Sequence, residues 1–371
     1  MEQLVYEVAL GLLPGIGDQL TRLLISYCGS AKQAWLAPPG KLQKIPGIGQ
    51  ATINSFKVNA SVLKQAEAIV RQAEKEEVNI LFYTNPAYPN RLKQIADAPA
   101  LLYYKGIADL NQAKIISIVG TRQCTAYGKE VTEQIVKDLA PYNTLIVSGL
   151  AYGIDIAAHR AAVNNQLPTV GVMANGLDII YPAVHRKVAE KMLENGGLLS
   201  ENTFGTKPDA PRFPARNRII AGMADATIIV EAAIKGGTLI TADIANSYNK
   251  DIMAVPGPIY SPVSEGCNYL IKSHKAAIYT GIKDLEELLN WDQNTSSANS
   301  SAKSKNSKYN PDDFSLEEYT IIRLLQDTKE EIIDNISWKT QISISQVASL
   351  LLALEFRGVV KSLPGKKFQL I

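Results

Sequence analysis

Two arginines that flank an asparagine form the strongest chemical signal in this chain of 371 residues. Arg216, Asn217 and Arg218 lie in the run FPARNRIIAGM (213–223), whose pattern predicts the start of a helix just before an apolar strand at 226–230. Neighbouring cations repel each other unless an anion lies between them. The rigid guanidinium fork matches the oxygens of a phosphate group. The run therefore predicts a phosphate contact, and the alternative is a cluster that only caps or pairs with the sheet.

The elements that would position these arginines are short apolar runs alternating with helical segments, from about residue 78 to 290. This alternation is typical of an α/β fold with a Rossmann-like, doubly wound and mostly parallel sheet. The runs are continuously apolar, as expected of strands covered on both faces. The candidate strands are 115–119, 144–147, 169–173, 198–200, 226–230 and 252–255.

Glycine and hydroxyl residues follow the carboxyl ends of these strands, where open parallel sheets bind their ligands. Glycine lets the backbone approach an oxyanion closely, hydroxyls add donors, and a helix start adds a favourable dipole. We assign a phosphate-binding surface to Gly120, Thr121, Arg122, Ser148, Gly149, Arg216, Asn217, Arg218, Gly236, Gly237 and Thr238.

The three arginines of this set are expected to converge on one edge of the sheet. Each charge-assisted bond to phosphate contributes roughly 1.5–3 kcal/mol, so several together make a binding surface. Asp178, Glu201 and Glu231 also end strands. We interpret them as groups that hold the arginines in place, while a catalytic carboxylate beside a bound nucleotide is the alternative. Asp155 and His159, four residues apart, are interpreted as a helix cap and a packed imidazole.

Sequence motifs for catalysis, nucleotide cofactors and metals are missing. No GxGxxG follows the first strand, no GxxxxGK[ST] occurs, and no serine, histidine and aspartate stand in a triad order. We therefore predict no catalytic residue, no cofactor and no metal. The cysteines and histidines are too dispersed for metal spacing; they are Cys28, Cys124, Cys267, His159, His185 and His274.

Composition bounds the class of protein. The chain has 38 Lys and Arg against 36 Asp and Glu, so a nucleic-acid footprint must be local. The N-terminus has no basic region, and no apolar stretch reaches about 18 residues. Three distant cysteines fit a reducing compartment. These features predict a soluble cytoplasmic protein without a membrane partner.

A repeated turn marks the N-terminal region. LPGIG at 13–17 recurs as IPGIG at 45–49, each between helix-like runs, which is the pattern of a helix-hairpin-helix. Glycines allow the tight turn, and the free amides of the next helix can bind a backbone phosphate. A secondary DNA contact is placed at Gly15, Gly17, Gly47, Gly49 and Lys57. The equal alternative is that the turns only join helices.

Four regions follow from these patterns. Residues 1–70 form a helical, helix-hairpin-helix (SAM-like) domain, and 78–290 form the Rossmann-like domain. Residues 292–311 are rich in Ser, Asn and Lys and read as a flexible linker. Residues 312–371 hold three helical stretches and a terminal hairpin, which suggests a winged helix with 343–357 as its third helix.

Longer segments of the core resemble a known family. SIVGTR (117–122), SGLAYGIDIAAHRAA (148–162), GLDIIYP (176–182), FPARNRIIAGM (213–223) and EAAIKGGTLITADIA (231–245) closely resemble the DNA-processing protein A (DprA, also called Smf) family. The resemblance extends from about residue 78 to 290, and the flanking helical and winged-helix regions fit the same layout.

The resemblance implies a cytoplasmic protein of natural transformation and recombination. Members of the family bind single-stranded DNA, shield it, load the recombinase RecA onto it and catalyse no reaction. The family dimerises through the Rossmann-like domain. Its DNA pocket coincides with the surface assigned above, so a DNA-binding role carries over to that whole set, with the 148–153 loop as a segment that either contacts DNA or shapes the pocket.

Two other functions remain as alternatives. The Gly236-Gly237-Thr238 turn is similar to the PGGxGTxxE motif of lysine-decarboxylase-like hydrolases, which cut nucleoside monophosphates. Here Lys235 replaces the proline, and 239–242 offers no matching glutamate, which favours binding without turnover. A winged-helix regulator is the other alternative, but 343–354 carries no basic residue for reading the major groove of a DNA duplex. The basic Lys361, Lys366 and Lys367 near the hairpin leave duplex DNA as a further partner.

Overall fold

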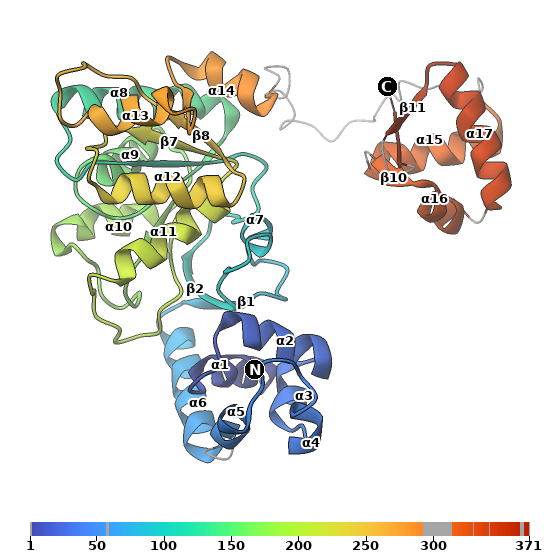
Figure 1. Cartoon of the computed structure of the whole chain (residues 1–371), viewed down its shortest axis with the longest axis horizontal. Coiled ribbons are helices and arrows are strands. Elements are labelled where there is room, and N and C mark those ends of the chain that lie inside the picture. The colour runs from blue at the N-terminus through green and yellow to red at the C-terminus, as the bar shows by residue number, and fades with distance from the viewer. Residues whose placement is uncertain are drawn as a thin grey trace. The chain divides into compact units, whose positions relative to one another are not determined.

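The computed structural model describes residues 2–56, 59–291, 314–328, 330–340, 342–363 and 367–370. They belong to two compact units, residues 1–298 and 299–371. The predicted linker at 292–311, Lys57 and Lys366 lie outside the described residues. Figure 1 shows the helices and strands of both units.

A nine-stranded sheet is the centre of the first unit, in the order β1-β2-β6-β5-β4-β3-β7-β8-β9. The seven strands β6, β5, β4, β3, β7, β8 and β9 are parallel to one another, whereas β1 and β2 are antiparallel to their neighbours. This confirms the mostly parallel α/β fold. The strands are β1 Asn79–Phe82, β2 Leu101–Gly106, β3 Ile115–Gly120, β4 Leu145–Ser148, β5 Thr169–Met173, β6 Gly197–Ser200, β7 Ala226–Val230, β8 Asp251–Ala254 and β9 Ala277–Ile278.

Three of these strands, β1, β2 and β9, were not predicted. The central strands β3, β4, β5, β6 and β7 are buried almost throughout, which gives the continuous apolar runs that sequence patterns reveal. By contrast, β9 has two exposed residues, Ala277 and Ile278, and no pattern to detect. The edge pair β1 and β2 lies outside the alternation of strand and helix.

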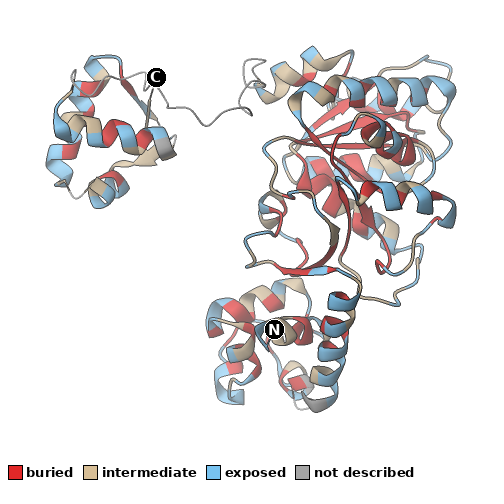
Figure 2. Ribbon diagram, turned by 180° about the vertical axis from the view of Figure 1, so that it is seen from behind, coloured by how far each residue is buried: buried red, intermediate tan, exposed pale blue. Residues whose placement is uncertain are grey.

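Helices cover both faces of the sheet, as a doubly wound fold requires. One apolar core includes Leu92, Ile219, Ala242 and Leu270, and the other includes Ile135, Ile154 and Leu285. Figure 2 shows buried residues along the strands and on the inner sides of the helices. The helices are α7 Asn90–Lys93, α8 Ala126–Leu139, α9 Ile154–Asn164, α10 Arg186–Met192, α11 Arg212–Met223, α12 Gly237–Ser247, α13 Glu265–Lys272 and α14 Ile282–Leu289.

The N-terminal helices pack beside β1 and β2 (Figure 1). Leu10 and Leu24 share one apolar core with Ile80, Phe82 and Tyr103 of the sheet. Burial of such side chains contributes about 1.5–3 kcal/mol each, so this part of the chain is held firmly against the sheet. The helices are α1 Glu2–Leu12, α2 Asp18–Cys28, α3 Ala31–Trp35, α4 Pro39–Leu42, α5 Gln50–Ser55 and α6 Asn59–Lys75.

The described residues of the second unit form three helices and a three-stranded antiparallel sheet, which together make the predicted winged helix. Ile321, Ile336, Val347 and Leu351 form its own apolar core. The expected third helix is present as α17, and the terminal hairpin as β11 and β12, with β10 as an additional strand. The elements are α15 Leu316–Thr328, β10 Glu330–Ile332, α16 Ile333–Thr340, α17 Ile344–Phe356, β11 Val360–Leu363 and β12 Lys367–Leu370.

Among the described residues, no helix is long and apolar enough to cross a membrane.

Candidate functional site

A groove of about 790 Å³ lies beyond the carboxyl ends of the parallel strands, between the loops after β3 and β7 and the helices α11 and α12. Most of the residues assigned from the sequence meet there. The predicted residues that line it are Gly120, Thr121, Arg122, Arg216, Asn217, Gly236, Gly237 and Thr238. The groove is the location that a parallel sheet provides for a ligand.

The loop after β3 forms one wall of the groove. Gly120 is required by close packing, because a Cβ atom there would lie 2.0 Å from the Val230 carbonyl oxygen. The Thr121 amide donates to the Glu231 carbonyl oxygen at 2.8 Å. Arg122 then projects from a fixed loop, exposed, with its guanidinium carbon 5.3 Å from the centre of the Phe213 ring. The loop thus presents a cation on an aromatic surface.

Arg216 comes from α11 and is buried beneath the groove, with only 5% of its surface exposed. Its Nη1 donates to the Val172 carbonyl oxygen, and its Nε donates to Asn217 Oδ1 at 3.1 Å. Both acceptors are neutral, and none of the ion pairs within 4.0 Å between described residues includes Arg216. Arg216 therefore makes no direct ion pair with a described residue, although the buried Asp155 carboxylate is near enough to interact with its charge.

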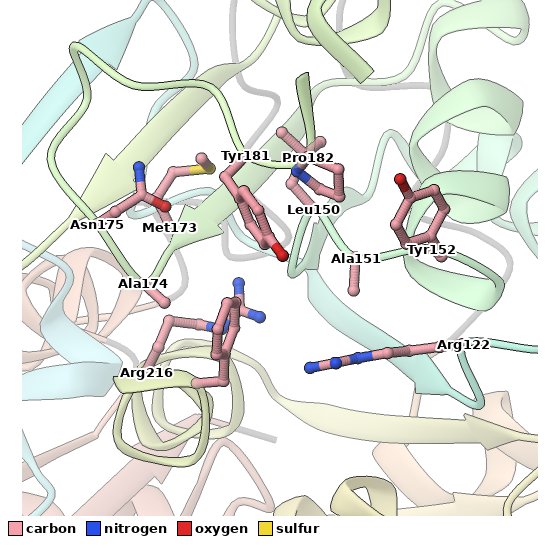
Figure 3. A pocket seen from close by; sticks show the side chains of 11 residues that line it. Arg122, Leu150, Ala151, Tyr152, Met173, Ala174, Asn175, Tyr181, Pro182 and Arg216 are labelled. Atoms are coloured by element: carbon pink, nitrogen blue, oxygen red, sulfur yellow. The ribbon is translucent and has the colours of Figure 1, made fainter. Parts of the chain in front are cut away.

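Burial lowers the pKa of Arg216 to about 10, Asp155 opposes this effect, and the positive charge of Arg122 adds to it. Arg216 is still protonated at neutral pH. Figure 3 shows its guanidinium and that of Arg122 pointing toward the same space, below the ring of Tyr181. Two cations that face one space favour an anion between them.

A smaller cavity of about 80 Å³ adjoins the groove and shares Arg122, Arg216, Tyr181 and Phe213 with it. Its other walls are mostly apolar, from Leu150, Met173 and Pro182 among others (Figure 3). Tyr181 and Phe213 lie 5.9 Å apart, centre to centre. The site therefore combines guanidinium groups with aromatic rings.

Ser148 and Gly149 do not line the groove but support it from below. The Ser148 hydroxyl donates to the Ile118 carbonyl oxygen at 2.6 Å. Gly149 has no room for a side chain, because a Cβ atom would lie 2.4 Å from Asp155 Oδ2 and 2.5 Å from Arg216 Nη2. These two residues form the packed layer beneath the Arg216 guanidinium.

His159 is a packed imidazole, as expected, but the expected cap by Asp155 is wrong, because Gly153 is the N-cap of α9 and no side chain of a described residue caps that helix. Asp155 and His159 are both buried. Asp155 accepts from the Ala151 amide at 3.4 Å, and His159 bonds to the Gly149 carbonyl oxygen and to Thr169 Oγ1. Burial first, and then Arg216 and His185, lower the pKa of His159 to about 4 against the effect of the Gly149 bond. Burial raises the pKa of Asp155, while Arg216 opposes that change.

The expectation that three arginines converge is corrected by the structure, because Arg218 lies elsewhere. Its Nη2 pairs with Glu201 Oε2 and lies 3.8 Å from Asp18 Oδ2, and its Nη1 donates to the Asp97 carbonyl oxygen at 2.7 Å. Residues two apart on a helix point in directions about 200° apart, so Arg216 and Arg218 face opposite sides of α11. Arg218 belongs to the contact between the sheet and α2.

The three strand-end carboxylates do not all hold arginines. Glu201 does so, through Arg218. Glu231 instead accepts from the amide and the hydroxyl of Thr125, the residue that caps α8. Asp178 accepts from the Gly205 amide at 2.9 Å. For Glu231 and Asp178 the expected role was therefore wrong, because backbone amides near these strand ends satisfy the carboxylates locally.

The groove residues that were not assigned from the sequence include Phe213, Tyr181, Gln123 and Lys235. Phe213 precedes Arg216 by three positions, so helical spacing places both on one face and was a usable signal. Tyr181 comes from a loop that no local pattern directs toward the groove. Within the described residues, no group of three or more His, Cys, Asp or Glu side chains is arranged to hold a metal ion.

The two N-terminal turns have the same backbone. Gly15 and Gly47 have φ values of 78° and 80°, in the left-handed region that favours glycine. Gly17 and Gly49 then precede α2 and α5 as N-caps. The first turn is followed by Asp18, whose Oδ1 accepts from the Ala100 amide at 2.7 Å. The turns differ in surroundings, because Asp18 ties the first one to the sheet.

A Rossmann-like sheet, an arginine- and glycine-lined groove at its carboxyl edge and a winged helix are the features to compare with known proteins. The family model for DNA recombination-mediator protein A matches residues 79–290, and the model for the DprA winged helix domain matches residues 321–366. The chain belongs to the DNA-processing protein A (DprA/Smf) family.

Individual relatives agree over long alignments. Protein Smf of Synechocystis is 32% identical, with 98% of each chain covered. DNA processing protein DprA of Streptococcus pneumoniae is 40% identical over 54% of this chain and 71% of that protein. Its solved structure has a TM-score of 0.60 at 29% identity, covering 76% of this chain and 96% of that one.

A second solved structure, DNA processing protein A of Helicobacter pylori, is described for its unique single-stranded DNA binding mode. It has a TM-score of 0.53 at 30% identity and covers 58% of this chain and 96% of that one.

Proposed function

We propose that this protein binds single-stranded DNA through the groove, largely without regard to base sequence. The observation that carries the proposal is that the guanidinium groups of Arg122 and Arg216, which form no direct ion pair among the described residues, face one space beside glycine-rich loops. Guanidinium groups, loop amides and the Thr121 and Thr238 hydroxyls are suited to phosphate oxygens. The relative from Helicobacter pylori, described by its single-stranded DNA binding mode, supports this choice of ligand.

The aromatic rings of the groove favour a single strand over a duplex. Phe213 and Tyr181 lie next to the two arginines. A base can stack on such a ring only when it is not paired, and stacking tolerates every base. Phosphate contacts carry no sequence information either. Both contacts therefore predict binding that depends on the strand's backbone and single-strandedness.

Fluorescence anisotropy with labelled oligonucleotides tests this function. Single strands of different sequence should bind within a few-fold of one another and tighter than a duplex, and the log–log slope against salt should be about −0.7 per phosphate neutralised. A steep preference for one sequence, or equal affinity for the duplex, would contradict phosphate readout of a single strand.

We also propose that the groove binds without turnover. Hydrolases with a similar glycine turn have a glutamate shortly after it, and residues 239–242 of this chain, LITA, contain none. Incubation with AMP and related nucleoside monophosphates, followed by chromatography, should show no released base. A stoichiometric excess of free base over enzyme would establish the hydrolase alternative, and Asp155, which lines the groove, would then be the first carboxylate to replace.

The family resemblance further supports shielding of the bound strand, loading of RecA and a homodimer through the Rossmann-like unit. Ile259 and Tyr260, in the loop between β8 and α13, are 74% and 91% exposed and offer an apolar surface for a second copy. Light scattering should give the mass of a dimer. Nuclease digestion should be slower on the bound strand, and RecA assembly on that strand should be faster; unchanged digestion and assembly would remove these two activities.

A further inference from the structure

The outer face of α17 is an exposed apolar surface in the winged-helix unit. Ile344, Ala348, Leu352 and Phe356 follow each other at four-residue spacing and therefore share one side of the helix. All four are exposed, and Phe356 is 84% exposed. The buried side is a different one, formed by Val347, Leu351 and Leu354. We call these four exposed residues the α17 stripe.

The α17 stripe has no charge to attract an ionic partner. Residues 343–354 contain no charged side chain. Glu355 is occupied within the unit, because its Oε1 accepts from the Ser362 amide at 3.0 Å and from the Ser362 hydroxyl at 2.7 Å. Arg357 at the end of the helix pairs with Glu318 at 3.4 Å. A phosphate backbone would find no cation on this helix, so duplex DNA is a poor occupant.

The sequence of the stripe is complementary to itself when two copies run antiparallel. About a centre at position 350, Ile344 faces the partner copy's Phe356, and Ala348 faces the partner copy's Leu352. The small Ala348 leaves a hole that Leu352 can fill, as in the packing of ridges into grooves between helices. Antiparallel helices also place their dipoles favourably. We propose that the α17 stripe pairs with the same stripe of a second copy of this chain.

The size of the surface indicates when this contact forms. Four such side chains offer roughly 300–400 Å² per copy, below the approximately 800 Å² per partner of a standard stable interface. The pair is therefore weak between free molecules. It forms between copies already held together, where tethering raises the effective concentration to the millimolar range. The tethering of the two copies rests on the dimer proposed above. The pairing of the stripes does not depend on that dimer.

Cysteine cross-linking in the full chain tests the register. Copies with Ala348→Cys are mixed with copies with Leu352→Cys, allowed to exchange subunits and treated with a mild oxidant. Antiparallel pairing brings the two positions within disulfide reach, so the mixture should yield about fivefold more cross-linked dimer than either variant alone. The control is Arg323→Cys, an exposed position on α15 that is not part of the stripe, mixed with either variant. The native cysteines are checked with the unmodified chain.

A second measurement separates this contact from the Rossmann-like dimer. Leu352→Glu, introduced into both the Ile344→Cys and the Phe356→Cys chains, should abolish the cross-link between these two facing positions when the chains are mixed, while light scattering still reports a dimer. If the unmodified chain is monomeric but the stripe cysteines still cross-link at raised concentration, the dimer proposal fails and the stripe contact stands. A mixture that cross-links no better than the α15 control overturns the stripe contact, as does loss of duplex DNA binding in Leu352→Glu without any stripe cross-link.

Discussion

The groove and the junction between α2 and the sheet use arginines from the same helix in opposite ways. In the groove, Arg216 bonds to neutral acceptors and makes no direct ion pair among the described residues, with the buried Asp155 as its neighbouring carboxylate. At the junction, Arg218 pairs with Glu201 and lies near Asp18. The groove arginine is held by hydrogen bonds to neutral groups, whereas the arginine at the junction is neutralised by a direct ion pair. One short run of sequence thus contains both a ligand-binding group and a group that holds two parts of the fold together.

The largest expected difference between the two regions is the pH dependence of their contributions to folding stability. His159 under the groove has a pKa near 4 when folded and an ordinary value of 6.5. Between these values only the unfolded chain takes up the proton, so stability falls as pH falls, by about 3 kcal/mol from this group. Burial raises the pKa of Glu201 at the junction, so its contribution has the opposite sign.

Urea unfolding between pH 7 and pH 4.5 measures this dependence. The comparison is with His159→Gln, which should show a flatter loss of stability over the same interval. Identical pH slopes in the two proteins would show that His159 is not buried and neutral in the folded state.

Replacing Arg122 should have the largest effect on DNA affinity. Arg122→Ala removes a charge-assisted phosphate contact of roughly 1.5–3 kcal/mol, which corresponds to about a 10- to 100-fold weaker affinity for single strands. Its side chain is exposed, so unfolding should be unaffected. Arg71→Ala is the matched control, since Arg71 is 78% exposed on α6. Equal affinity of the two variants, measured by anisotropy, would place the DNA elsewhere.

Replacing Arg218 should reverse this pattern. Arg218→Ala leaves the mostly buried Glu201 without its ion-pair partner. We therefore expect a loss of about 1–3 kcal/mol in unfolding free energy. Single-strand affinity should stay within about twofold of the original, because Arg218 does not line the groove. A large loss of affinity with intact stability would return Arg218 to the binding site and remove the contrast between the two faces of α11.

The smallest effect is expected at the outer wall of the groove. A Cβ atom on Gly237 would meet nothing within 4 Å, so Gly237→Ala should change stability by no more than about 0.5 kcal/mol. Gly120→Ala is the contrasting variant, because its Cβ atom would lie 2.0 Å from a carbonyl oxygen. Thermal unfolding of both proteins measures the difference, and comparable losses would mean that the wall is more tightly packed than this geometry indicates.

Much of this arrangement could be predicted from the sequence, because its signals are local. Buried parallel strands leave continuous apolar runs, and the glycines at 120 and 149 follow two of them. The opposite directions of Arg216 and Arg218 were also predictable from helical geometry, although the run of basic residues suggested a single cluster. The contact of Asp18 with Ala100 was not predictable, because it joins residues far apart in the chain and depends on tertiary packing.

Helix α11 carries Arg216 on one side and Arg218 on the other, so the positions of the two side chains are coupled. Any rotation that withdrew Arg216 from the groove would also pull Arg218 away from its carboxylates, and separating such a pair is costly. The groove is consequently kept in shape before a ligand arrives. Little of the binding free energy is then used for rearrangement, because the binding site is preorganised for an incoming strand.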